Sequence, residues 1–352
     1  MKSLVYYGPW DVRVEDRPSK ECPYQQYDYD YQLAVETDLT VFKPSLVPEL
    51  KGAKDVIIKT TSAALCGSEL HAFRGHQDRV PGYICGHEGA GIVVQVGDEV
   101  KRFKKVGNVF TANTTYRLVV WIPMADTTLE LAPAELGEEV ILMADIYPTG
   151  FNGARNAFNA FPRESHKDMV VVVIGCGPVA LCGIAAALEF QPRLLYAVDS
   201  VPARLERARA LGAIPLDFKT QDVKQVILSA TNGRGADAVI EVVGHPDALR
   251  TAYDIVRLGG KISVIGLHTR PLPFTGDEAY QKNVHIQFGR CPVRSVFNDA
   301  LASLVRNKDK MKGLVDLIIP VLDQTCVEAL HRFEKNQHFK VVFKPNGHSV
   351  TI

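Results

Sequence analysis

The stretch 66–88 gathers more reactive side chains than any other short span of the chain. It reads Cys-Gly-Ser-Glu-Leu-His at 66–71 and Gly-His-Glu-Gly-Ala-Gly at 86–91. Thiolate and imidazole are ligands that Zn²⁺ prefers, and a catalytic zinc takes three protein ligands and keeps one position open. Cys66 and His87 supply two such ligands, so a third must come from elsewhere. The pair alone is a weak signal, because a cysteine is more often a small buried hydrophobic residue than a metal ligand.

A glycine-rich turn later in the chain predicts a dinucleotide site. The apolar run Val-Val-Val-Val-Ile at 170–174 reads as a buried strand, and Gly-Cys-Gly-Pro-Val-Ala at 175–180 follows it and opens a helix. A second strand, 194–199, ends in Asp199, which stands 24 residues (199 − 175) after the first glycine. A strand, a turn, a helix and an acidic residue at this spacing form the dinucleotide-binding fingerprint.

The parts of this turn have separate predicted roles. Gly175 permits the tight turn, and Gly177 lets the backbone approach the pyrophosphate, which lies on the helix N-terminus. The predicted pyrophosphate contacts are Gly175, Gly177, Pro178 and Val179. Asp199 is expected to accept hydrogen bonds from both adenosine ribose hydroxyls and to repel a 2′-phosphate, which favours NAD over NADP. Arg204 weakens that preference, because a guanidinium could reach such a phosphate.

The elements that must position these residues form a strand-rich first part and a second part in which strands alternate with helices. The predicted fold class is therefore α/β. Short strands punctuated by glycine dominate the first part of the chain, at 55–60, 92–97, 106–110 and 116–131. From residue 169 buried strands alternate with helices, at 170–174, 194–199, 238–243 and 261–266. The second pattern predicts a doubly wound parallel sheet covered by helices on both faces.

Several further elements are predicted from local signals. Residues 1–15 predict a hairpin around Gly-Pro-Trp-Asp. A helix at 138–144, a break at Pro-Thr-Gly 148–150 and a second helix at 151–161 precede the alternating region. The strand at 339–344 is expected to return to the first domain. Residues 16–52, rich in tyrosine, read as an insertion that forms either a surface excursion or a lid over a pocket.

Composition excludes several function classes. The chain has 352 residues, of which 46% are hydrophobic and 23% charged, which is typical of a globular protein with two domains. Forty basic and forty acidic residues cancel, so the charge gives no reason to expect nucleic acid or an acidic membrane as a partner. Seven cysteines without a Cys-x-x-Cys pair suit a reducing compartment, and no apolar run reaches membrane-spanning length. A cytoplasmic location is therefore expected.

The motifs together resemble those of the zinc-dependent medium-chain alcohol dehydrogenases, over nearly the whole chain outside 16–52. The resemblance rests on the stretches 66–71, 86–91, 145–150 and 175–180 and on Asp199. It implies a GroES-like catalytic domain of residues 1–147 and 289–352 and a Rossmann domain of residues 148–288. The stretches 125–129, 145–150 and 289–293 look most like the glutathione-independent formaldehyde dehydrogenase branch.

The resemblance also implies roles for individual residues. Asp145 stands where many relatives have a second cysteine, so Cys66, His87 and Asp145 are the implied zinc ligands. Glu88 is similar to the family residue that approaches the metal during ligand exchange. Ser68 and His71 resemble the family's proton relay, and the alternative for His71 is an ordinary surface histidine.

Cofactor and assembly follow from the same resemblance. Thr149 and Val242 are implied to pack on the nicotinamide, and the backbone near Ile265 and Leu267 to hold its carboxamide. Lys340 is implied at the pyrophosphate, with a solvated strand lysine as an equal alternative. The expected partner is a small alcohol or aldehyde, and a homodimer or homotetramer is expected through the sheet edge near 261–275.

Two departures from the family pattern leave alternatives open. Residues 110–116 contain no cysteine, so a single catalytic zinc and no structural zinc lobe are expected. The insertion at 16–52 leaves the substrate open. One alternative is a divergent member that binds nicotinamide cofactor but has lost zinc or performs a redox-neutral or biosynthetic reaction. Another is a binding or structural protein that uses the fold as a scaffold.

Overall fold

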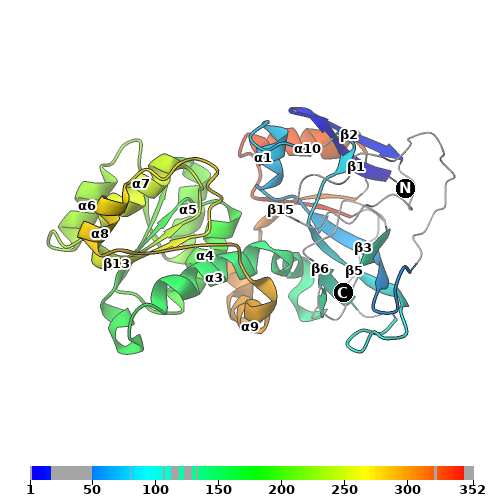
Figure 1. The fold of residues 1–352 in the computed structure, drawn as a ribbon, viewed down its shortest axis with the longest axis horizontal. Coiled ribbons are helices and arrows are strands. Elements are labelled where there is room, and N and C mark those ends of the chain that lie inside the picture. Colours follow the sequence, from blue (N-terminus) through cyan, green and yellow to red (C-terminus); the bar gives the residue numbers. More distant parts are fainter. Residues whose placement is uncertain are drawn as a thin grey trace. The chain divides into compact units, whose positions relative to one another are not determined.

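The chain forms two compact units, residues 1–144 with 315–352 and residues 145–314 (Figure 1). The computed structural model describes residues 2–16, 50–79, 81–105, 108–111, 119–122, 129–131, 134–320 and 323–344. The insertion predicted at 16–52 lies almost entirely outside these described residues. Within them, no helix is both long and apolar enough to span a bilayer.

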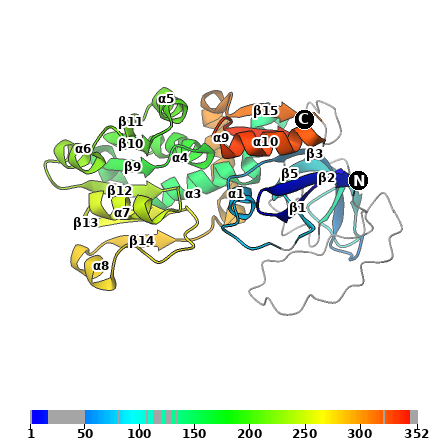
Figure 2. The ribbon, with the colours of Figure 1, turned by 90° about the horizontal axis from the view of Figure 1, so that it is seen from above.

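Unit 2 contains a sheet of parallel strands in the order β11-β10-β9-β12-β13-β14, which Figure 2 shows side by side. Its strands are β9 (Val170–Ile174), β10 (Leu194–Asp199), β11 (Ile214–Asp217), β12 (Ala236–Glu241), β13 (Val256–Val264) and β14 (His285–Phe288). Numbered along the chain, this order is 3-2-1-4-5-6, the order of a Rossmann fold, so the predicted doubly wound sheet is confirmed. The order reverses between β9 and β12, which is where such sheets bind ligands.

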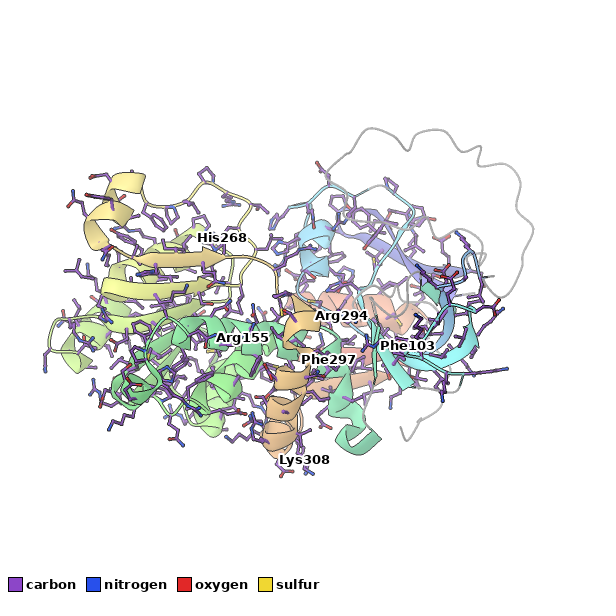
Figure 3. The ribbon with its side chains drawn as sticks, turned by 60° about the horizontal axis from the view of Figure 1, so that its bottom comes forward. Phe103, Arg155, His268, Arg294, Phe297 and Lys308 are labelled. Carbon is purple, nitrogen blue, oxygen red and sulfur yellow. The ribbon has the colours of Figure 1, made fainter. Side chains whose placement is uncertain are left out.

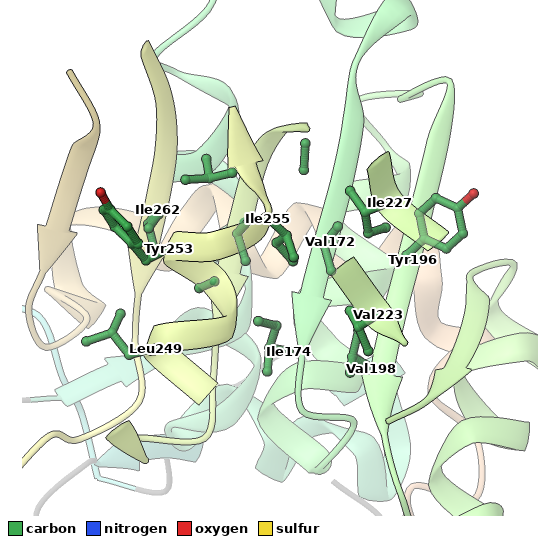
Figure 4. Close-up of a cluster of buried hydrophobic side chains, with 14 of the residues drawn as sticks. Val172, Ile174, Tyr196, Val198, Val223, Ile227, Leu249, Tyr253, Ile255 and Ile262 are labelled. Carbon is green, nitrogen blue, oxygen red and sulfur yellow. The ribbon is translucent and has the colours of Figure 1, made fainter. Parts of the chain in front are cut away.

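Helices cover both faces of this sheet. They are α3 (Ile146–Phe158), η2 (Arg163–Asp168), α4 (Pro178–Leu188), α5 (Pro202–Leu211), α6 (Val223–Ala230), α7 (Pro246–Ile255), α8 (Gly276–Lys282) and α9 (Val293–Met311). Val172 and Ile174 of β9 point into a cluster with residues of α6 and α7 (Figure 4). Alternate residues of a strand face opposite sides, so Val171 and Val173 face the side on which α3 and α4 pack. All of β9 is buried, as its apolar sequence predicts.

The predicted break at 148–150 is wrong, because α3 runs through it. Asp145 is the N-cap residue, so Pro148 lies in the first turn, where its missing N–H has no intrahelical partner to lose. Gly150 has a packing role instead. A Cβ there would lie 2.5 Å from the Gly183 nitrogen and 2.5 Å from the Val179 carbonyl oxygen. The glycine thus lets α3 approach the backbone of α4.

Unit 1 contains short strands in two sheets, as the glycine-punctuated pattern predicts, and the described strand pairs are antiparallel except for β15 with β16, which is parallel. One has the order β2-β1-β4 and the other the order β15-β16-β3-β5-β6-β8, with β7 paired to β3. The strands are β1 (Lys2–Gly8), β2 (Asp11–Asp16), β3 (Val56–Ala64), β4 (Tyr83–Ile84), β5 (Glu88–Val96), β6 (Asn108–Thr111), β7 (Val119–Ile122), β8 (Leu129–Leu131), β15 (Val315–Ile319) and β16 (Lys340–Phe343). The hairpin predicted at 1–15 is confirmed by the pairing of β1 with β2.

Among its described residues, unit 1 also contains the helical elements α1 (Glu69–Phe73), η1 (Ala134–Ala144) and α10 (Gln324–Glu334). The strand predicted at the end of the chain is confirmed, since β16 pairs with β3 within this unit. A core cluster joins α1, α10 and β16 through Phe73, Phe333 and Phe343. The last described strand, β16, therefore belongs to the same sheet as β3, the strand that precedes Cys66.

Candidate metal and dinucleotide sites

One ligand atom from each of Cys66, His87, Glu88 and Asp145 forms a group in which all four atoms lie within 4.8 Å of one another. Cys66 follows β3, and Glu88 opens β5, directly after His87. The antiparallel pairing of Ala64 with Glu88 brings these two strand ends together. Asp145 is the first residue of unit 2 and directly follows η1 in the chain. Because η1 packs against β5 and β6, it places Asp145 near the other three residues.

The donor set fits zinc. It offers one thiol sulfur, one imidazole nitrogen and carboxylate oxygens, which are the three ligand types that zinc takes in proteins. Zinc bonds of roughly 2.0–2.3 Å in a tetrahedron place ligand atoms about 3.3–3.8 Å apart. The observed 4.8 Å limit is within about 1 Å of that range. Small side-chain movements would therefore suffice to close the group on an ion.

Glu69 holds two of these ligands and was not singled out from the sequence. Its Oε1 lies 2.6 Å from Nδ1 of His87, and its Oε2 accepts a hydrogen bond of 2.7 Å from the Cys66 backbone N–H. A carboxylate on one ring nitrogen of a histidine fixes the ring and leaves the other nitrogen for a metal. The signal was available, because Glu69 stands three residues after Cys66 on the turn that opens α1.

Thr149 holds the Asp145 side chain. Its Oγ1 donates a hydrogen bond of 3.1 Å to Oδ1 of Asp145, and its backbone N–H donates to the Asp145 carbonyl oxygen at 3.0 Å. Cys291, a thiol of unit 2, donates to the Pro148 carbonyl oxygen at 3.3 Å. Burial and the Asp145 charge raise the pKa of Cys291 to about 12. Its sulfur is not among the ligand atoms that lie within 4.8 Å of one another, whereas an Asp145 oxygen is, so Asp145 is the candidate third ligand.

Ser68 and His71 lie at the start of α1, beside the metal-ligand group. Ser68 Oγ is exposed and lies 3.2 Å from Nε2 of His87. His71 is partly buried, and its ring centroid lies 6.5 Å from that of His76. Burial, followed by the nearby charges of His76 and Arg74, lowers the pKa of His71 below its ordinary value. A neutral imidazole at neutral pH can accept a proton.

Glu88 and Lys340 form a buried ion pair. Lys340 Nζ lies 2.6 Å from Oε2 of Glu88, donates to Oε1 at 2.7 Å and also donates to the Leu65 carbonyl oxygen at 3.0 Å. Lys340 is 1% exposed, so the alternative of a solvated strand lysine is wrong. Its ammonium is directed at the metal-ligand group, which does not favour the predicted contact with a pyrophosphate.

The glycine-rich turn has the shape that a pyrophosphate site needs. Gly175 has φ +95°, in the left-handed region that its sequence position predicts. Gly177 is the N-cap residue of α4 and, without a side chain, leaves the first turn without a side-chain cap. A Cβ on Gly177 would meet no atom within 4 Å, so the backbone is open there. The N-terminal turn of α4, at Pro178 and Val179, can thus receive an anion.

Asp199 is more heavily engaged than the sequence suggests. Its Oδ1 accepts hydrogen bonds from the Ser200 and Val201 N–H groups at 2.7 and 2.9 Å, and its Oδ2 accepts one from the Cys176 N–H at 2.8 Å. A carboxylate has about four acceptor directions, so three main-chain bonds leave about one, on Oδ2. For Asp199 to accept hydrogen bonds from both ribose hydroxyls, one of its three bonds from backbone N–H groups would therefore have to break.

The other predicted cofactor residues of unit 2 lie at the same edge of the sheet. Val242 follows β12 and donates from its backbone to the Ile174 carbonyl oxygen at 3.0 Å. Ile265 and Leu267 follow β13, and Leu267 is 48% exposed. Arg204 lies in the first turn of α5, directly after β10. In a parallel sheet the carboxyl ends share one edge, so these residues and the turn after β9 can face one extended ligand.

Comparisons with known proteins match both units. A family model described as zinc-binding dehydrogenase matches residues 178–306, and one described as alcohol dehydrogenase GroES-like domain matches residues 52–119. Zinc-type alcohol dehydrogenase B from Aspergillus flavus is 39% identical, over 98% of this chain and 81% of its own. Medium chain reductase/dehydrogenase ucsI from Acremonium sp. is 40% identical, over 80% of this chain and 98% of its own.

A solved structure supports the fold independently. The alcohol dehydrogenase TADH from Thermus sp. ATN1 superposes with a TM-score of 0.81 at 24% identity, and the match covers 98% of this chain and all of that one. At this identity the likeness speaks for the architecture alone.

Proposed function

Because the chain belongs to the zinc-type medium-chain alcohol dehydrogenase superfamily and is a zinc-dependent oxidoreductase, we propose that Cys66, His87 and Asp145 hold its catalytic zinc. The alternative of a divergent member without zinc is not favoured by these relatives. The observation that carries the proposal is the group of ligand atoms within 4.8 Å, with Glu69 bonded to two of its members.

Zinc at this site supplies a Lewis acid that lowers the pKa of an alcohol hydroxyl and polarises a carbonyl oxygen. The residues of the chain do the rest. Glu69 orients the His87 ring, and Thr149 orients the Asp145 carboxylate. Ser68 Oγ, on the Nε2 side of His87, takes the proton of the hydroxyl group and passes it towards His71. The lowered pKa of His71 keeps it neutral and able to accept.

A bound nicotinamide cofactor would supply the acceptor or donor of the hydride. The N-terminal turn of α4 would hold its pyrophosphate, and Asp199 would accept a hydrogen bond from one ribose hydroxyl through Oδ2. Val242 and Thr149 would pack on the nicotinamide ring, and the backbone at Ile265 and Leu267 would bind its carboxamide. We propose NAD over NADP because a 2′-phosphate would lie against the Asp199 carboxylate, with Arg204 as the residue that could reduce this preference.

The substrate is proposed only as an alcohol or its aldehyde. The resemblance of the stretches 125–129, 145–150 and 289–293 supports a proposal of the formaldehyde dehydrogenase-like branch. Between Cys85 and Cys176 the sequence contains no cysteine, which supports one catalytic zinc and no structural zinc. The division into a catalytic domain of 1–147 and 289–352 and a cofactor domain of 148–288 stays a prediction, because a division by contacts does not test which residues bind each ligand.

We further propose a homodimer or homotetramer and a cytoplasmic location. The pairing edge was predicted near 261–275, but β13 pairs with both β12 and β14 and is not an edge strand. The outer strand β14 has exposed side chains, including Phe288, and suits pairing with a second copy of the chain. None of the six cysteines in the described residues forms a disulfide, in keeping with a reducing, cytoplasmic compartment.

The test combines metal content with turnover. The purified wild type is expected to contain about one zinc per chain and to form NADH from NAD and a member of an alcohol panel. Cys66→Ala, His87→Ala and Asp145→Ala should lose zinc and turnover together, whereas Cys326→Ala, which removes a buried thiol of α10 outside the metal-ligand group, should lose neither. A wild type without zinc and without turnover on any alcohol or aldehyde would overturn the proposal.

A further inference from the structure

Glu241 is a buried carboxylate in unit 2 for which the proposed chemistry has no use. It ends β12, is 0% exposed and lies at the edge of the sheet where the cofactor residues gather. Its Oε1 accepts hydrogen bonds from the Val243 and Gly244 N–H groups, both at 2.8 Å. Its carbonyl oxygen accepts from Ile265 and Gly266 at 2.9 and 3.1 Å. One residue thus ties the loop after β12 to the loop after β13.

His268 completes this arrangement from the second loop. Its Nε2 donates a hydrogen bond of 2.9 Å to Oε2 of Glu241, and its side chain is only 6% exposed. The ring also makes an edge contact with Phe288 of β14, with centroids 6.1 Å apart. Figure 3 labels His268 beside the yellow ribbon of these last strands. His268 is therefore held between β12 and β14 while its backbone continues the segment of Ile265 and Leu267.

The two loops touch closely between these contacts. A Cβ on Gly266 would lie 2.2 Å from the Gly244 nitrogen and 2.6 Å from Oε2 of Glu241. Such a close approach leaves no room for the second loop to shift toward the first. The hydrogen bonds of Glu241 oppose movement of the second loop away from the first. Among these bonds, the one from His268 is made by a side chain of the second loop, and those from Ile265 and Gly266 are made by its backbone.

We propose that His268 is a positioning residue for the nicotinamide end of the cofactor, and that it acts through Glu241. The inference rests on the proposed function, in which Val242, Ile265 and Leu267 contact the nicotinamide. Loss of the His268 bond would leave a buried carboxylate with one donor fewer and release the backbone after Ile265. The adenosine end is held separately, by the bonds of Asp199 to the glycine-rich turn, and should be unaffected.

Two probes separate the ends of the cofactor: NADH, and ADP-ribose, which lacks the nicotinamide ring. Binding of both to the zinc-loaded protein is measured by calorimetry. His268→Ala should weaken NADH binding about 10- to 100-fold, the range expected for a lost hydrogen bond to a charged group, and change ADP-ribose binding less than about twofold. His268→Gln, which retains a donor, should recover most of the NADH affinity. His285→Ala, at the exposed start of β14, is the matched histidine control and should change neither.

The outcomes are distinct. Suppose that the wild type binds both probes. If His268→Ala then lowers the affinities for NADH and ADP-ribose equally, or lowers neither affinity, the inference is wrong while the proposed function stands. If the wild type binds neither probe, the proposed function is wrong and the inference with it. His268→Phe keeps a ring against Phe288 without the donor, so it gives the same comparison should the alanine variant fail to fold. NADH affinity retained in His268→Phe would also overturn the inference.

Discussion

At the scale of single residues, the geometry of the candidate metal site depends on the metal-ligating residues and equally on the neighbouring side chains that hydrogen-bond to them. Glu69 contacts both His87 and the Cys66 backbone, and Thr149 contacts Asp145. Each of these contacts removes rotational freedom from a ligand before an ion binds, so less ordering remains to oppose binding. Substitutions at Glu69 should accordingly affect metal affinity more than fold stability.

Glu69→Gln is expected to weaken zinc binding roughly 10- to 100-fold, because an amide holds the His87 ring less strongly than a carboxylate does. The affinity would be measured by competition with a chelator of known strength. Glu206→Gln, an exposed carboxylate of α5, serves as the control and should leave zinc affinity unchanged. Equal affinity in the two variants would show that Glu69 does not orient the ligand.

His71→Gln tests the proton relay through its pH dependence. The pKa of His71 lies below the ordinary 6.5, so the wild type should hold its kcat for alcohol oxidation near neutral pH and lose it as pH falls below 6.5 and the imidazole becomes charged. The variant should be slower by about tenfold or more at neutral pH and should lack this decline. A steady-state pH profile measures both. An unchanged profile would return His71 to the alternative of an ordinary surface histidine.

At the scale of elements, close helix packing explains a signal that the sequence alone misassigned. Pro148 and Gly150 suggested a break, whereas both belong to α3. Proline was tolerated because it fell in the first turn, and glycine was required because α4 lies against it. Helix propensity identifies proline and glycine as residues that disfavour a helix interior. Only the three-dimensional structure shows whether such a residue ends the helix or allows close packing against a neighbouring element.

Gly150→Ala is expected to destabilise unit 2 by roughly 1–3 kcal/mol or more, because its Cβ would overlap backbone atoms of α4 that cannot rotate away. Urea unfolding followed by circular dichroism would measure the change. Gly276→Ala, at the first position of α8 with no atom within 4 Å of the added Cβ, provides a matched helix substitution and should be neutral or slightly stabilising. Similar midpoints for the two variants would contradict the packing explanation.

At the scale of the whole molecule, the sheet of unit 2 was predictable from the sequence, because strand, glycine turn and acidic residue follow each other locally. The structure also brings the predicted zinc ligands Cys66, His87 and Asp145 together, and their role as ligands stays a prediction. Contacts between distant residues were harder to predict. The pairing of Lys340 with Glu88 spans 252 positions of the chain, and nothing near Lys340 in the sequence indicates its partner. Likewise, the bonds that occupy Asp199 come from backbone groups, which have no sequence signature.

Lys340→Met tests this long-range pair. Removing the ammonium would leave a buried carboxylate without its counter-charge and should lower the free energy of unfolding by roughly 3–5 kcal/mol. The double variant Glu88→Gln with Lys340→Met should recover part of that loss, since neither charge then remains buried. Chemical denaturation of all three variants gives the comparison. A Lys340→Met protein as stable as the wild type would show that the pair contributes little.

The placement of β16 has a consequence for how the protein is made. Unit 1 is assembled from residues at both ends of the chain, with β16 between β15 and β3, while unit 2 is continuous. A ribosome therefore completes the cofactor-binding sheet while the strand neighbour of β3 has not yet been synthesised. Strand β7 already pairs with the first residues of β3, but the end of β3 next to Cys66 lacks its partner strand until residues 340–343 emerge. This is the period when the nascent chain most needs protection from aggregation.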